Sequence, residues 1–313
     1  MSGDEKERGD VSPHTPFYFS EAGTRRLNLR THKNRGGLDA KGVQRGIPSP
    51  GLPRRALLAL LLLPATARAG SYAQGLLVTG RVLPGTRLAL DGRPLRVSPR
   101  GDYAFGFGRD HGPEAVLTVT PPGGKPEAQR LAVAKREWQV QRLQGLPGAM
   151  VTPPPETMAR IIRERDHLAA LRKVDSAEPH FAAGFVWPAT GRISGVYGSQ
   201  RILNGEARAP HVGLDVAVPV GTPLRAAAAG RVLLAMDLYF TGQTVVIDHG
   251  FGVQTLYAHM SRLDVTEGTQ VASGQGIGLS GATGRVTGPH LHFAMNWFST
   301  AVDPASALPA AQG

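Results

Sequence analysis

The sequence contains no cysteine among its 313 residues. This absence excludes disulfide bonds, cysteine-based zinc sites and thiol catalysis, so any metal ion must be bound by histidine and carboxylate side chains. The sequence also lacks a basic helix with interleaved aromatic residues. We therefore expect no nucleic-acid partner.

An apolar run long enough to span a membrane, which takes about 20 residues, is missing as well. The longest run, ALLALLLL, follows two arginines and precedes PATARA, which ends in small residues. This order is typical of a secretory signal peptide. We predict a leader over residues 1–69, with the signal peptide at about 52–69. The polar segment upstream of it is long for a signal peptide and is interpreted as a start assigned too early.

Because we expect this leader to be removed, we predict an exported protein of the periplasm or cell envelope, without a stable membrane span. An N-terminal anchor that is never cleaved is the alternative. Twelve of the 35 Lys/Arg residues and six of the 24 Asp/Glu residues precede residue 70, so about half of the net charge of +11 lies in the leader. The remainder is mildly basic, which suits an anionic envelope polymer.

Helical periodicity is rare, whereas glycine and proline are abundant, with 40 and 25 residues. This balance favours a mostly β, turn-rich protein. Residues 70–141 alternate short apolar runs with turns and predict a small β-sandwich domain. Residues 142–182 predict a helical connector, with a helix over 156–174. Residues 183–309 predict a compact domain built on an antiparallel β-sheet.

Two of the ten histidines, His290 and His292, lie one residue apart in TGPHLHFAMNW. On a strand, residues i and i+2 share a face, so both rings are expected on one side of the sheet. The intervening positions, from Leu291 to Trp297, are apolar and form the expected core face. The pair is thus favoured as part of a polar site rather than as core histidines.

Two more motifs carry groups of the same chemistry. His211 and Asp215 are separated by about 13 Å in an extended strand, slightly too far to share one ion, and Gly213 between them can supply a bend. His259 follows Tyr257-Ala258 at the expected end of another strand. His211, Asp215 and one histidine of the pair would make three ligands, which leaves the open position of a catalytic zinc site.

Three stretches, RAPHVGLDVAVPVGTPLRAAAAGRV, VVIDHGFGVQTLYAHMSRL and GLSGATGRVTGPHLHFAMN, resemble the lysostaphin-like, LytM-type zinc endopeptidases. The resemblance covers about residues 185–308 in motif order, spacing and glycines. The sandwich and the segment GSQRILNGEARAPH are similar to the periplasmic, Gram-negative branch. The resemblance implies hydrolysis of peptide cross-links of peptidoglycan in a cleft floored by a β-sheet.

The resemblance also assigns roles to single residues. It implies that His211, Asp215 and His292 bind one Zn2+ per chain, and that His259 and His290 are the catalytic residues. How these two histidines divide the proton transfers and the stabilisation of charge is left open. Peptidoglycan stem peptides are the expected partner, and the sequence indicates neither the bond cleaved nor an oligomeric state.

One position departs from the family pattern. Many relatives have glutamate where this chain has Ala294, which strand alternation places beside the cleft. Because the position is not a ligand position, the change is expected to alter substrate contacts rather than to abolish activity.

Two hypotheses of function compete. The favoured one is a secreted zinc endopeptidase that acts on peptidoglycan. The alternative is a catalytically silent LytM-type protein that binds the wall and activates a partner amidase; the five intact site residues argue against it. A structural zinc module is excluded because such a site is closed by four protein ligands. The N-terminal sandwich is expected to position or restrain the peptidase domain.

Overall fold

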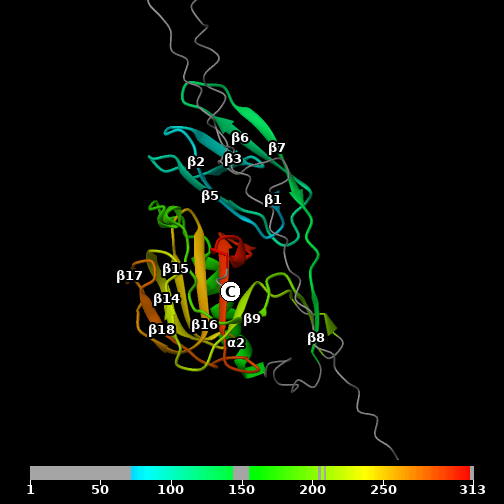
Figure 1. Ribbon diagram of the computed structural model, residues 1–313, viewed down its shortest axis with the longest axis vertical. Coiled ribbons are helices and arrows are strands. Elements are labelled where there is room, and N and C mark those ends of the chain that lie inside the picture. The colour runs from blue at the N-terminus through cyan, green and yellow to red at the C-terminus, as the bar shows by residue number, and fades with distance from the viewer. Residues whose placement is uncertain (1–71, 144–154, 204–205, 208, 311–313) are drawn as a thin grey trace, which may run out of the picture. The chain divides into compact units, whose positions relative to one another are not determined.

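A computed structural model describes residues 72–143, 155–203, 206–207 and 209–310 (Figure 1). The predicted leader, residues 1–69, lies outside the described residues. Within the described part of the chain, no helix is long and apolar enough to cross a membrane.

The N-terminal described segment forms two sheets. A five-stranded sheet has the order β1-β7-β6-β3-β4, and β2 pairs with β5 in a second sheet. Side chains of β6 alternate between exposed and buried over most of its length, as the sequence predicted. The strands are β1 Tyr72–Ala73, β2 Leu77–Arg81, β3 Arg87–Leu90, β4 Arg93–Leu95, β5 Asp102–Gly106, β6 Glu114–Thr120 and β7 Glu127–Ala134.

The C-terminal segment is built on a ten-stranded sheet whose pairs are antiparallel, with the main order β17-β14-β15-β16-β19-β12-β9. Its strands are β9 Arg192–Gly195, β12 Gly213–Ala217, β13 Pro223–Arg225, β14 Gly230–Leu238, β15 Gly242–Asp248, β16 Val253–Leu263, β17 Gln270–Val271, β18 Gly276–Ser280, β19 Leu291–Trp297 and β20 Thr300–Val302. The fold is therefore mostly β, as predicted.

A small parallel pairing joins the two segments of chain. Strand β8, Val140–Leu143, pairs in parallel with β10, Gln200–Leu203, which also pairs with β11, Glu206–Ala207. Nearby, Arg136 forms an ion pair with Asp303 at 2.8 Å.

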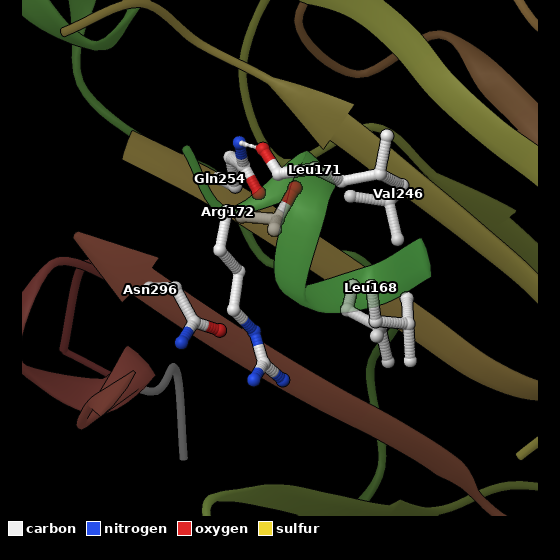
Figure 2. Close-up of a pocket in the computed structure, with 8 residues that line it drawn as sticks. Leu168, Leu171, Arg172, Val246, Gln254 and Asn296 are labelled. Atoms are coloured by element: carbon white, nitrogen blue, oxygen red, sulfur yellow. Dashed lines mark hydrogen bonds between the residues drawn. The ribbon is translucent and has the colours of Figure 1, made fainter. Parts of the chain in front are cut away.

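The one α-helix of the described residues is α2, Pro155–Leu171, close to the predicted range of 156–174. It packs on the C-terminal sheet: Leu168 and Leu171 contact a cluster of buried side chains from β14 and β15, together with Leu256 of β16. The side chain of Gln254 donates a hydrogen bond to the carbonyl of Leu171 at 2.7 Å (Figure 2). Two short 3-10 helices complete the described elements, η1 His180–Ala183 and η2 Pro304–Ser306.

The two faces of β19 differ as the alternation predicted. Leu291, Phe293 and Met295 are fully buried in the main core. The opposite face carries His292, which pairs in register with Asp215 of β12 and with Ala258 of β16. Antiparallel pairing therefore brings side chains 77 residues apart in sequence to one place.

Candidate active site

Three side chains converge on one point beside β12 and β19. The Oδ1 atom of Asp215 lies 3.0 Å from Nε2 of His211 and 2.8 Å from Nδ1 of His292. The two histidine nitrogens are 3.1 Å apart. Asp215 lies on β12, His211 lies just before that strand, and His292 lies on the neighbouring β19. The structure therefore brings together all three predicted ligands in a group that could hold a metal ion.

Glycine makes this convergence sterically possible. A Cβ atom on Gly213 would lie 2.7 Å from Cε1 of His292, and one on Gly195 would collide with the carboxylate of Asp215. Gly213 does not have the left-handed backbone conformation. The position therefore needs glycine for space, and the predicted bend at Gly213 is not what the glycine contributes.

The backbone sets the tautomer of His211. Its Nδ1 atom lies 3.0 Å from the carbonyl oxygen of Val196, and because a carbonyl can only accept, Nδ1 carries the hydrogen. In the neutral ring, Nε2 then directs a lone pair at the Asp215 carboxylate. Two acceptors facing each other repel, whereas a cation between them satisfies both.

The donor set fits zinc. Ligands about 2.1 Å from a tetrahedral zinc ion lie about 3.4 Å from one another, close to the separations in this group of two imidazole nitrogens and one carboxylate oxygen. Burial by itself raises the pKa of Asp215, but the adjacent side chains of His211 and His292 outweigh burial and hold the pKa well below its usual range. Asp215 is therefore an anionic ligand at neutral pH.

His259 lies beside this group in an irregular part of β16. The register with both neighbouring strands shifts around it, and its φ of 62° lies in the left-handed region. It is thus inside the strand rather than at its end, where we expected it. Its backbone N–H donates to Thr241 at 2.8 Å, and its Nδ1 donates to the carbonyl of Thr283 at 2.8 Å. Two independent anchors hold this uncommon conformation.

His290 immediately precedes β19 and completes the cluster. Its Nδ1 donates to the carbonyl of Gly288 at 2.8 Å, and its Nε2 lies 3.7 Å from Oδ1 of Asp215. The rings of His259 and His290 are 4.8 Å apart. Burial lowers the pKa of His259 to about 4, against the opposing effect of the Thr283 carbonyl, so His259 is neutral at pH 7.

The helix α2 contributes to this arrangement from outside the sheet. Glu164 accepts a hydrogen bond from the backbone N–H of Tyr239 at 2.8 Å and pairs with Arg160 at 2.5 Å. Arg160 also pairs with Asp237 at 2.9 Å. These contacts hold the turn between β14 and β15, whose Thr241 carbonyl accepts from His259.

Sequence reasoning did not find several of these supports. Glu164, Thr283 and the carbonyl of Val196 act through backbone groups or through a distant turn, which leave no side-chain pattern. Gly195 had a detectable signal, since a glycine within a strand indicates close approach of another group.

Other histidines have different surroundings. His249 is fully buried, with Nδ1 2.7 Å from the Ala229 carbonyl and Nε2 2.7 Å from Oγ1 of Thr255. Both ring nitrogens of His249 therefore have hydrogen-bond partners within the core. His167 is exposed on α2.

Ala294 lies on the same face of β19 as His292 and is paired with Gly213 and with Leu256. Its side chain is buried. The position therefore provides a small apolar floor next to the cluster.

A family model described as "Peptidase family M23" matches residues 209–304, a range that contains all five residues of the cluster. A solved structure of a peptidase M23 from Pseudomonas aeruginosa superimposes with a TM-score of 0.60 and 30% sequence identity, over 76% of this chain and 95% of that one. This chain belongs to peptidase family M23. The family membership predicted from the three sequence stretches, and with it the enzyme class, is confirmed.

Curated relatives are similar to about a third of this chain. Peptidoglycan DD-endopeptidase ShyA of Vibrio cholerae is 46% identical over 103 residues, 33% of this chain and 24% of the relative. DD-carboxypeptidase/endopeptidase Mpg of Neisseria meningitidis is 46% identical over 100 residues, 32% of this chain and 23% of the relative. The chain thus spans about a quarter of the length of these relatives.

Proposed function

We propose that this M23 protein is a zinc metalloendopeptidase that hydrolyses peptide cross-links of peptidoglycan. The observation that supports it most is the convergence of His211, Asp215 and His292 beside two backbone-anchored histidines. ShyA and Mpg, whose names describe peptidoglycan or DD-peptide hydrolysis, are 46% identical to this chain over 103 and 100 residues. By analogy with them, the bond is a D,D cross-link between stem peptides.

His211, Asp215 and His292 would hold the zinc ion and leave one position open. A zinc ion held in this way supplies Lewis-acid polarisation of the scissile carbonyl and lowers the pKa of water. The chain itself fixes the ligands: Val196 orients the ring of His211, and Gly195 leaves room for the carboxylate of Asp215.

His259 and His290 would carry out the proton transfers. Each ring is held through Nδ1 by a backbone carbonyl, which leaves an Nε2 lone pair for the reaction. Between them they accept the proton of the attacking water, donate a hydrogen bond to the oxyanion and protonate the leaving amine. Because the tautomer of both rings is fixed, Nε2 is the atom that exchanges protons in each ring.

The other parts of the chain have proposed roles as well. The leader over 1–69 would direct export to the periplasm or envelope, where the substrate lies. The sandwich over 70–141 would position or restrain the peptidase domain of 183–309, through the connector of 142–182. The contact between Glu164 of this connector and the turn beside His259 gives such a coupling a physical route.

Digestion of purified sacculi, followed by mass spectrometry of the products, tests the activity and the bond together. Wild-type protein should release un-crosslinked muropeptides, a chelator should stop the release, and added Zn2+ should restore it. His290→Ala should be inactive, whereas His167→Ala, an exposed histidine on α2, should retain activity. Zinc binding without any cleavage would favour the wall-binding, amidase-activating alternative.

A further inference from the structure

A second pair of polar side chains lies on the same face of the sheet as the metal-binding cluster. Asn296 of β19 is four residues beyond His292, and it lines a pocket together with Arg172 at the end of α2 (Figure 2). The apolar part of this pocket is formed by Leu168, Val246 and Leu256. The pocket has a volume of about 20 Å3, room for one water-sized group such as a carboxylate oxygen.

The guanidinium of Arg172 has no ion-pair partner within the described part of the chain, although the residue is half-buried. Two arginines within α2 differ from Arg172: Arg160 pairs with Glu164, and Arg165 pairs with Asp166 at 2.9 Å. Burial lowers the pKa of Arg172, the direction expected for a charge that is partly removed from water. Such a group normally acquires a partner.

The side chain of Asn296 is a second polar group that is available to a ligand. Its side-chain amide makes no hydrogen bond with the described residues, whereas the neighbouring Gln254 is engaged with the Leu171 carbonyl. A guanidinium and an amide are the two side-chain donors that best match a carboxylate, because both present planar N–H groups. No acidic side chain lines the pocket.

The pocket is aligned with the proposed reaction centre. Four residues along a strand place Asn296 about 13 Å from His292, on the same face. Between them lies Ala294 with its two register partners, Gly213 of β12, which has no side chain, and Leu256 of β16, which lines the pocket. An extended peptide with its scissile bond at the cluster would reach the pocket three or four residues away.

We infer that Arg172 and Asn296 form an anion-binding subsite for a carboxylate of the substrate peptide, three or four residues from the scissile bond. This inference rests on the proposed function, because peptidoglycan stem peptides carry such carboxylates. The subsite selects substrates whose carboxyl groups are free over those in which they are amidated. It also explains why the arginine that directly follows α2, outside the matched range of 209–304, has no ion-pair partner among the described residues.

The test uses the full chain and two synthetic cross-linked stem peptides that differ only in having free or amidated carboxyl groups. A charge-assisted hydrogen bond to the substrate predicts a kcat/KM about tenfold higher for the free acid. Arg172→Gln should reduce this ratio to near one, and Asn296→Leu should reduce it in part. The matched control is Arg165→Gln, an exposed arginine on the same helix, which should keep the wild-type ratio.

A thermal-unfolding measurement separates a binding role from a structural one. Arg172→Gln should unfold at the same or a higher temperature than wild type, because an uncompensated charge is removed. A lower unfolding temperature, with equal loss of activity on both peptides, would show that Arg172 is structural and would overturn the inference. Equal wild-type rates on the two peptides would overturn it as well.

Calorimetric binding to the inactive His290→Ala protein keeps the test independent of catalysis. Zinc-loaded His290→Ala should bind the free-acid peptide about tenfold more tightly than the amidated one. If wild type cleaves neither peptide, the proposed function fails, and the binding ratio still decides whether the subsite exists. Equal binding of the two peptides would reject the subsite while cleavage of both would leave the proposed function standing.

Discussion

Two buried aspartates, one in each β segment, show how differently this chain uses the same side chain. Asp102 in β5 accepts a hydrogen bond from Ser98 at 2.8 Å and pairs with Arg81 at 2.6 Å. Asp215 in β12 faces His211 and His292 instead. In both, neighbouring polar side chains outweigh the effect of burial and lower the pKa of the carboxyl.

The difference lies in what remains unsatisfied. Arg81 carries a permanent charge, and Ser98 also accepts from the backbone N–H groups of Arg100 and Asp102, so the site of Asp102 is complete within the chain. Around Asp215 the ring of His211, anchored through Nδ1, presents a lone pair to a carboxylate. A complete site stabilises the fold, whereas an incomplete one requires a ligand.

Removal of a proposed metal ligand should have the largest effect. His292→Ala should lower the rate of peptidoglycan digestion at least about 1,000-fold, since the Lewis-acid contribution is worth several kcal/mol. Release of soluble muropeptides measures this rate, and zinc content per chain should fall in parallel. Substantial digestion by a zinc-free His292→Ala protein would contradict the proposed difference between the two aspartates, because the site of Asp215 would then need no metal ligand.

The peptidase segment also contains a buried polar group whose hydrogen bonds are all made within the chain, the ring of His249. Burial lowers its pKa to about 4, from about 6.5 in the unfolded chain. The unfolded state therefore binds more protons between these pH values, and the free energy of unfolding falls as the pH drops from about 6.5 to about 4. The contribution of this one group is about 3 kcal/mol.

Urea unfolding of metal-free wild type and His249→Gln at several pH values measures this contribution. The variant should have the smaller loss of stability between pH 6.5 and pH 4, whatever its stability at neutral pH. Identical slopes for the two proteins would show that His249 is not the titrating group.

Substitution of the two aspartates tests the comparison directly. Asp102→Ala should lower the free energy of unfolding by about 2 kcal/mol, because charged hydrogen bonds to a buried group are lost. Asp215→Ala, measured with a chelator, should cost less than Asp102→Ala, because the substitution also removes the repulsion between the carboxylate and the ring lone pair of His211. Equal destabilisation of the metal-free protein by both substitutions would contradict the distinction.

The smallest effect is expected at the helix that supports the site. Glu164→Ala should lower kcat about tenfold, the scale of an outer hydrogen bond that orients a catalytic group, with little change in KM. Glu164→Gln keeps an oxygen that accepts from Tyr239 and should recover part of the activity. A change confined to KM would indicate that α2 contacts substrate here rather than orienting His259.

Much of the site follows from local sequence rules. Strand alternation placed His292 opposite the apolar residues Leu291 and Phe293, and the structure agrees. The helix near 156–174 followed from apolar spacing and a proline-rich start. The class of fold followed from the turns and short alternating runs.

Other features could not be predicted, because they depend on partners distant in sequence. The irregularity at His259 arises from register shifts against both β15 and β18. The role of Gly213 depends on a ring contributed by β19. The docking of α2 on the sheet, and with it the position of Arg172, depends on tertiary packing that helical periodicity does not specify.

The sequence by itself determined the donor types, the absence of thiols and the side of each strand on which a side chain lies, because these follow from composition and a two-residue repeat. Only the tertiary structure decided which donors meet and which have no ion-pair partner among the described residues. Antiparallel register joins Asp215 to His292, and the docking of α2 places Arg172 beside Asn296. Both results come from contacts between segments far apart in the chain, whose pairing local propensities do not encode.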